Sequence, residues 1–401
     1  MRFHGNDVRY RNLMAAAAAV AVALCVPGTA RAGDTVRIAL VRHVASAVIA
    51  SEAGLTVRPT DDVDPTHSFV LPDLATVLDV RAENGKLVIA NSIAVGPKVL
   101  IASPLGLPID VNGAPYRGNI VVQLDPDGAL TVVDFVDLEQ YLYGVVGSEM
   151  PASWPTAALE AQAIVARTYA IGRLGIRDDV GYDLVAGDQD QAYGGVDSES
   201  PSTIHAADST RGEILVYEGQ IVHTYYSADD GGFTANGSAL SDPQPYLIAK
   251  ADPYALGSPD NEWSTTIPAA DLAQSVDALY TNVGDLTGIT PGPSDESGRI
   301  ETISIFGTLG SATLSGFDFR RLAGRRAVRS TKISALALYG SRIRVSGSGF
   351  GHGVGMSQWG ARSMAAAGIG CLDILRFYYS GTELTTIADV PVYAPPAVEG
   401  P

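Results

Sequence analysis

The chain is poor in cysteine and in basic residues, and both shortages limit what it can be. Only two cysteines occur among 401 residues, and 27 basic residues face 44 acidic ones, which gives a formal net charge of −17. A strongly acidic surface repels phosphate backbones, which proteins bind through Lys and Arg. We therefore expect no nucleic-acid partner, and no docking on anionic lipid by charge alone.

Long hydrophobic runs are also scarce, and the most prominent one stands near the N-terminus. Three arginines precede an unbroken apolar run from Leu13 to Val26, and Ala30-Arg31-Ala32 follows. This arrangement is typical of a secretory signal, and the run is shorter than the ~20 residues that a membrane-spanning helix needs. We predict a signal peptide over residues 1–32 and a secreted, extracytoplasmic protein without stable membrane insertion. An uncleaved N-terminal anchor is the alternative.

Cleavage after Ala32 would leave 369 residues with a net charge of −20 and one cysteine, Cys371. A single thiol forms no internal disulfide, so packing must hold the core together. This length suits one large domain or two smaller ones. An apolar content of 46% with 43 glycines is typical of a folded, loop-rich α+β protein.

Hydrophobic periodicity predicts strands in the first part of the chain and two Ala-rich helices later. Asn119–Leu124 and Leu130–Phe135 flank Asp125-Pro-Asp-Gly128, a pattern typical of a hairpin. Apolar residues at helical spacing predict helices over Thr156–Gly172 and Ser357–Ala367. We expect a strand-rich region over 33–110, a mixed α/β domain over 111–388 and a Pro-rich tail over 389–401.

One carboxylate, Glu149, stands in an apolar context. It lies between an apolar segment, which we interpret as a strand, and a helix start marked by Pro151 and Pro155. Partial burial among apolar neighbours would raise the pKa of this carboxyl and keep it protonated, as a general acid requires. The alternative is a glutamate that stabilises the start of the helix, and spacing alone favours it.

A glycine-rich segment, Gly347–Ala361, precedes the second Ala-rich helix. It contains no G-x-G-x-x-G frame and no phosphate-binding Gly-Lys-Ser/Thr, and it misses the G-x-S-x-G elbow by one residue. We interpret it as a flexible turn that exposes His352 and places Ser357 and Gln358 at a helix start. A plain tight turn explains it equally well.

Polar side chains that suit sugar hydroxyls gather in two further segments, 188–195 and 223–234. The same residue types are common in surface loops. The histidines at 205, 223 and 352 and Cys371 are not paired at metal-ligand spacing. We therefore expect no metal and no cofactor.

Together these segments resemble the SpoIID/LytB family, which comprises stage II sporulation protein D and the amidase enhancer LytB. The resemblance runs from about Val111 to Leu384. Its motifs include Glu149-Met-Pro151, Ala161-Gln162-Ala163, Ala166-Arg-Thr-Tyr169, Gln191-Ala-Tyr-Gly194 and Gly351-His-Gly353, followed by Gly360-Ala361. One departure is Asp230 before Gly231-Gly232, where the family often has Ser or Asn.

The resemblance implies a SpoIID-like core in which the two Ala-rich helices line a glycan groove. It also implies a lytic transglycosylase that cleaves peptidoglycan glycan strands with Glu149 as its acid. Residues expected to line the groove are Arg167, Gln191, Tyr193, Ser227, His352, Ser357 and Gln358. LytB-type members imply the alternative, a non-catalytic enhancer that partners a cell-wall amidase.

Overall fold

The computed structural model describes residues 35–60, 69–70, 76–89, 93–241 and 243–390. The predicted signal peptide lies outside the described residues, as does the predicted tail beyond Val390. The described residues have a mixed α+β fold, as predicted. None of the described helices combines the length and hydropathy needed to cross a membrane.

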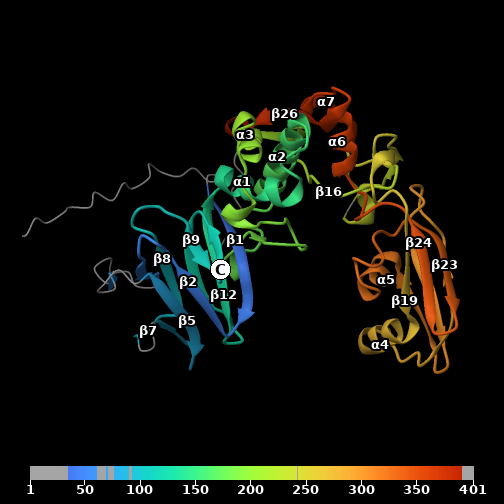
Figure 1. Ribbon diagram of the computed structural model, residues 1–401, viewed down its shortest axis with the longest axis horizontal. Coiled ribbons are helices and arrows are strands. Elements are labelled where there is room, and N and C mark those ends of the chain that lie inside the picture. Colours follow the sequence, from blue (N-terminus) through green and yellow to red (C-terminus); the bar gives the residue numbers. More distant parts are fainter. Residues whose placement is uncertain (1–34, 61–68, 71–75, 90–92, 242, 391–401) are drawn as a thin grey trace, which may run out of the picture. The chain divides into compact units, whose positions relative to one another are not determined.

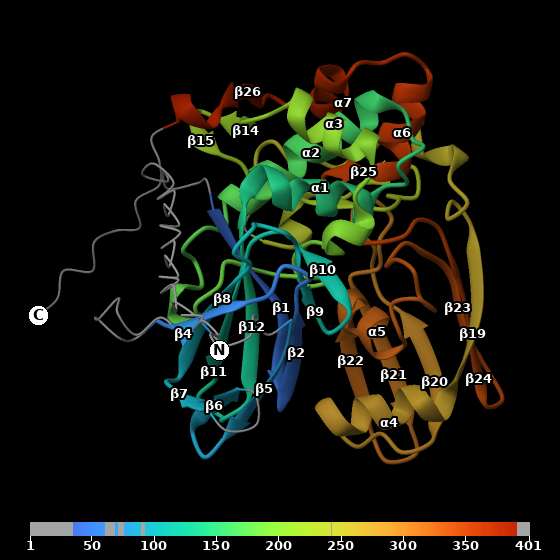
Figure 2. The same ribbon diagram turned by 60° about the vertical axis from the view of Figure 1, so that its left-hand side comes forward.

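Two antiparallel sheets dominate the N-terminal part (Figures 1 and 2). The first has the order β13 (Leu184–Val185), β1 (Thr35–Val44), β12 (Leu130–Asp137), β11 (Asn119–Leu124), β8 (Lys98–Ala102), β3 (Thr56–Pro59) and β4 (Phe69–Val70). The second has the order β10 (Ala114–Tyr116), β9 (Ile109–Val111), β2 (Ser46–Ala50), β5 (Val77–Glu83), β6 (Lys86–Ile89) and β7 (Ile93–Val95). Among the described strand pairs of these two sheets, only the short β13 pairs in parallel, with β1.

Alternation along the strands builds one core between these sheets. In the predicted hairpin, which β11 and β12 confirm, Ile120, Val122 and Val132 face the shared core. Val121 and Val133 point to the other face, where Tyr182 covers them. The period of two therefore buries both faces of this hairpin, and the strand-rich part of the chain continues to Asp137.

The predicted strand before Glu149 is wrong, because residues Leu138–Glu149 form helix α1. Asp137 ends β12 and caps the helix: its carboxylate accepts hydrogen bonds from the backbone N–H groups of Glu139 (3.0 Å) and Gln140 (3.1 Å). Such an N-cap satisfies donors that have no partner within the helix. A Cβ at Gly147 would lie 1.8 Å from the carbonyl oxygen of Ser198, so this glycine allows close packing rather than a break.

Helix α2 (Thr156–Ile171), predicted from the sequence, lies at the centre of the largest hydrophobic core. It packs against α1, α3 (Pro201–Ser209), α6 (Gln358–Ala366) and α7 (Cys371–Tyr378) (Figure 2). A small sheet of β15 (Gln220–Ile221), β14 (Glu213–Tyr217) and β26 (Glu383–Thr386) adjoins it. The helices α3 and α7 were not predicted.

A third core forms between residues 263 and 345. Its strands are β19 (Trp263–Pro268), β24 (Arg342–Gly347) and β23 (Ile333–Tyr339), with β20 (Leu286–Pro291), β21 (Thr302–Gly307) and β22 (Ser311–Ser315). Helices α4 (Ala269–Leu279), as predicted, and α5 (Gly316–Leu322) belong to it. Strand β24 leads directly into the glycine-rich segment, and so returns the chain to the central helices.

Candidate active site

Three hydrogen-bond donors from distant parts of the chain converge on the carboxylate of Glu149, the last residue of α1. The backbone N–H of Ala192 (2.8 Å) and the hydroxyl of Tyr226 (3.2 Å) donate to Oε1. The side-chain amide of Gln358 donates to Oε2 at 3.1 Å. Glu149 itself is half-buried, and the three donors hold its carboxylate in one orientation.

The surroundings favour the protonated form of this carboxyl. Burial raises the pKa of Glu149 above its ordinary value, and the three hydrogen bonds oppose this shift without cancelling it. The carboxyl also lies at the C-terminal end of α1, where the helix dipole disfavours a negative charge. In the part of the chain that the structure describes, no cation forms an ion pair with Glu149.

The donors are positioned by a parallel pairing that the sequence did not reveal. Strand β16 (Tyr226–Ser227) pairs with β25 (Met356–Ser357), so Tyr226 lies opposite Met356 and Ser227 opposite Ser357. This pairing places Gln358, the first residue of α6, beside Tyr226 and Glu149. The sequence reasoning missed Tyr226, whose only signal was its place among polar residues in the 223–234 segment.

A second layer of amides fixes these donors. Gln191 is buried, and its amide nitrogen donates to the Tyr226 hydroxyl at 3.1 Å while its oxygen accepts from Tyr141. The amide nitrogen of Gln358 also contacts Oε1 of Gln162 on α2 at 3.4 Å. Of the predicted groove residues, Gln358 therefore contacts Glu149 directly and Gln191 acts through Tyr226.

Ser227 and Ser357 are buried and serve the backbone of this region. The Ser227 hydroxyl accepts from the N–H of Gly353 at 3.2 Å. The Ser357 hydroxyl accepts from the N–H of Gly360 at 3.2 Å and caps α6. Neither hydroxyl reaches Glu149 by a hydrogen bond, so their structural role is to hold the β16–β25 junction in place.

The glycine-rich segment packs against other parts of the chain, and the prediction that it exposes His352 is wrong. A Cβ at Gly351 would lie 2.4 Å from Cβ of Ser227, and one at Gly353 would lie 1.8 Å from the Arg299 guanidinium. His352 is half-buried, and its Nδ1 accepts from the N–H of Val354 at 3.0 Å. Burial, with the nearby positive charge of Arg299, lowers the pKa of His352 to about 3. His352 is therefore neutral at ordinary pH.

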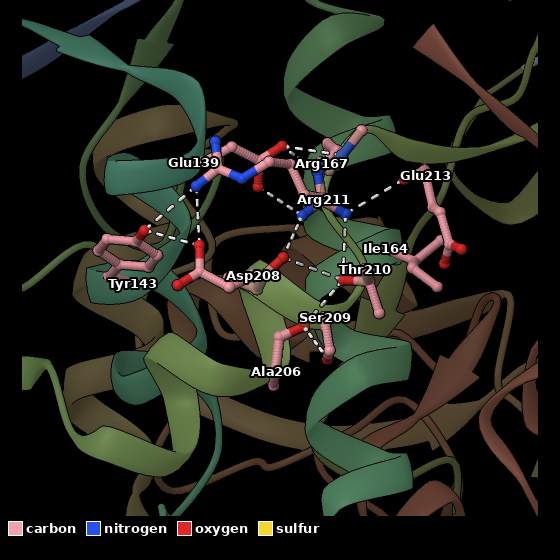
Figure 3. A network of polar contacts seen from close by, with 12 residues as sticks. Glu139, Tyr143, Ile164, Arg167, Ala206, Asp208, Ser209, Thr210, Arg211 and Glu213 are labelled. Atoms are coloured by element: carbon pink, nitrogen blue, oxygen red, sulfur yellow. Dashed lines mark hydrogen bonds and ion pairs between the residues drawn. The ribbon is translucent and has the colours of Figure 1, made fainter.

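Arg167 was expected in the groove but is completely buried, and Figure 3 shows the polar contacts around it. Its guanidinium forms a two-pronged ion pair with Glu139, with N–O distances of 2.9 and 2.6 Å. It also donates to the carbonyl oxygens of Ala207 and Glu213. All of these contacts lie inside the protein, so Arg167 joins α1, α2 and α3 and is not available to a ligand.

Tyr193 is likewise buried away from Glu149. Its hydroxyl donates to Asp134 at 2.9 Å, and its ring packs against Tyr141 and Tyr116. Burial raises the pKa of Asp134 to about 7. Tyr193 therefore fastens the 188–195 segment to β12, and its neighbour Ala192 supplies the donor to Glu149.

Asp188, an acidic side chain from another segment, lies within electrostatic range of Glu149. Asp188 is exposed, and its negative charge adds to the upward shift of the Glu149 pKa. The sequence reasoning found no second acid within the Glu149 motif, and Asp188 comes from a different segment. It is the carboxylate to test if the chemistry uses two acids.

Asp230, the departure from the family pattern, is completely buried beside Asp252. Burial and the neighbouring Asp252 raise the pKa of Asp230, while the backbone N–H of Gly232 donates to it at 2.8 Å. The Tyr378 hydroxyl occupies one oxygen of Asp252 at 2.7 Å. A substrate contact through Asp230 is therefore not supported, and its charge state bears on stability instead.

One further group of side chains has the composition of a metal site, His43 with Asp125 and Asp127. It lies at the β11–β12 hairpin, where Asp127 and Asp125 already accept hydrogen bonds from Ala129 and Thr131. These are ordinary contacts of an acidic turn, away from Glu149 in the contacts described.

The chain is similar to bacterial stage II sporulation proteins. The family model described as "Stage II sporulation protein" matches residues 126–217. Stage II sporulation protein D of Bacillus subtilis (strain 168) is 31% identical over 309 residues, covering 72% of this chain and 82% of the relative. The same protein of Bacillus amyloliquefaciens is 30% identical over 272 residues, which is 63% of this chain and 75% of the relative.

These matches define the class: the chain belongs to the SpoIID family. It is also 32% identical over 296 residues to a protein named "Amidase enhancer" of Bacillus subtilis (strain 168). That match covers 61% of this chain and 40% of the relative. The chain therefore corresponds to less than half the length of the amidase enhancer.

Proposed function

We propose that this protein is an exported cell-wall protein that cleaves peptidoglycan glycan strands as a lytic transglycosylase. The observation that carries the proposal is the half-buried Glu149 carboxyl, which three donors hold and which forms no ion pair with a cation among the described residues. From the described residues, Oε1 accepts two hydrogen bonds and Oε2 accepts one. The free position on Oε2 is where a proton would sit, ready for transfer.

The proposed reaction needs one acid. Glu149 donates its proton to the glycosidic oxygen as the bond from that oxygen to the anomeric carbon breaks. The 6-hydroxyl of the same N-acetylmuramic acid then attacks the anomeric carbon, and its proton returns to Glu149. The products are a 1,6-anhydromuramyl end and a free 4-hydroxyl on N-acetylglucosamine, and no water is consumed. Hydrolytic glycosidases generally use two carboxylates.

Digestion of purified glycan strands, followed by mass spectrometry, tests the proposal. The expected product is lighter by one water than the hydrolytic product. Products with the mass of hydrolysed reducing ends would contradict the transglycosylase reaction. The protein would then still be an enzyme that cleaves glycan. Absence of any cleavage would remove the enzymatic proposal.

A second candidate rests on the similarity to the amidase enhancer. In this case the protein binds the cell wall and stimulates a separate N-acetylmuramoyl-L-alanine amidase without cleaving glycan. Release of stem peptides by a purified amidase, measured with and without this protein, separates the two. Stimulation that persists in Glu149→Gln, with no glycan product from the wild type, would favour the enhancer.

A further inference from the structure

Two tryptophans lie together beside the Glu149 site without belonging to the chemistry proposed for it. Trp154 is in the turn between α1 and α2, and Trp359 is the second residue of α6. Their ring centroids are 5.0 Å apart with an interplanar angle of 58°. Trp359 directly follows Gln358, which donates to Glu149. Because consecutive Cα atoms are about 3.8 Å apart, the backbone of Trp359 adjoins that of a residue that contacts the proposed acid.

An arginine lies over this pair. The Arg362 guanidinium is 5.1 Å from the centroid of the Trp359 ring and 5.9 Å from that of Trp154. It follows Trp359 by three residues on α6, which places both side chains on one face of the helix. Within the described ranges no carboxylate pairs with Arg362, although acidic residues outnumber basic ones by 44 to 27 in this chain. Its donors are therefore free for a ligand.

Core packing does not account for the Trp359 ring. Trp154 packs partly against the central core, whereas Trp359 belongs to none of the hydrophobic cores of the described residues. The third tryptophan, Trp263, shows the contrast: it is buried, and its indole N–H donates to the carbonyl of Gly349 at 2.9 Å. Among the residues described, neither Trp154 nor Trp359 has an acceptor for its indole N–H.

We propose that Trp154, Trp359 and Arg362 form a sugar-binding subsite, in which an N-acetylhexosamine ring stacks on the face of the Trp359 indole that Arg362 does not cover. Trp154 supports the Trp359 indole from the side of the core. Arg362 donates hydrogen bonds to acetamido or hydroxyl oxygens of the sugar. A tryptophan offers a large apolar face with a polar N–H at its edge, which matches the C–H face and hydroxyl rim of a pyranose. This subsite rests on the proposed function in that the same glycan would reach Glu149.

Binding measured without cleavage tests the subsite separately from the reaction. In the full chain carrying Glu149→Gln, an N-acetylglucosamine oligomer is titrated and tryptophan fluorescence is recorded. We expect the oligomer to change the fluorescence, and Trp359→Ala to weaken its binding by about tenfold or more, as truncation of a central aromatic anchor does. Trp359→Phe keeps a stacking face and should retain most of the binding.

Tyr339→Ala is the matched control. Tyr339 is an exposed aromatic side chain, 64% exposed, with the Arg344 guanidinium 5.6 Å from its ring, but it lies on β23 in the third core region. The Tyr339→Ala substitution should leave binding of the oligomer unchanged. Binding to insoluble peptidoglycan should follow the same order as binding to the oligomer.

Unchanged affinity in a folded Trp359→Ala variant would overturn the subsite. Equal loss in Trp359→Phe and Trp359→Ala, in proportion to a lower melting temperature, would also overturn it by showing a structural role. If the wild type never cleaves glycan yet Trp359→Ala abolishes binding, the subsite stands and the transglycosylase proposal fails. If the wild type cleaves glycan and Trp359→Ala has the same KM and affinity, the transglycosylase proposal stands and the subsite fails.

Discussion

The substitution Glu149→Gln tests the proposed catalytic role of this residue separately from its role in folding. Glutamine keeps the length of the side chain, and its oxygen can still accept from Ala192 and Tyr226. Its amide nitrogen would, however, face the amide nitrogen of Gln358, 3.1 Å from the position of Oε2. Rotating the amides of Gln358 and Gln162 restores both contacts, because Nε2 of Gln162 has no partner among the described residues. The variant should therefore fold.

The expected stability change follows from the raised pKa of Glu149. The pKa of Glu149 is higher in the folded state than its unfolded value of 4.5. The contribution of this group to folding stability is therefore lost as pH rises from 4.5 through the folded pKa. Glutamine does not titrate, so Glu149→Gln should melt at the same temperature as the wild type or higher at pH 8. The loss of a proton that can be given and retrieved should reduce turnover by about a hundredfold to ten-thousandfold.

The assay combines release of anhydromuramyl product, glycan binding and thermal melting on one preparation. Wild-type turnover should also fall as pH rises through the raised pKa of Glu149, because the acid must be protonated. Glycan cleavage by Glu149→Gln at the wild-type rate would refute the assignment of Glu149. If Glu149→Gln melts at a lower temperature and no longer binds glycan, the role of Glu149 is structural.

Other substitutions give different signatures. Glu139→Gln leaves the buried Arg167 charge uncompensated and should lower the free energy of unfolding by about 3–5 kcal/mol in urea, with the folded fraction as active as wild type; an unchanged stability would contradict the buried pair. Asp188→Asn should retain cleavage and shift the alkaline limb of the pH–rate profile slightly downward, whereas complete loss would indicate a two-carboxylate hydrolase. The raised pKa of Asp230 should make the wild type less stable as pH rises above 3.8. Asp230→Asn should lessen this decline, measured as the free energy of unfolding in urea at pH 5 and pH 8. An equal decline in the variant and the wild type would contradict a raised pKa at Asp230. Chelator should leave activity and melting temperature unchanged, and loss restored by zinc would reveal a metal.

Local periodicity was sufficient for the elements whose own residues decide their conformation. The β11–β12 hairpin follows from alternation around a Pro-Asp-Gly turn, and α2 and α4 follow from apolar spacing. The α1 helix was missed because Gly144 and Gly147 disfavour helix in isolation. These glycines are needed because distant residues pack closely against α1: a Cβ on Gly144 would lie 2.8 Å from the Tyr193 ring.

The sequence by itself identified Glu149 as the carboxylate of interest, together with the family. Only the tertiary structure decided which groups surround it, because Ala192, Tyr226 and Gln358 are 43, 77 and 209 residues away along the chain. No local pattern encodes contacts over such separations. For the same reason Arg167 could not be distinguished beforehand from a ligand-binding arginine: its partner Glu139 is 28 residues away. Burial of both charges inside one core makes the pair structural.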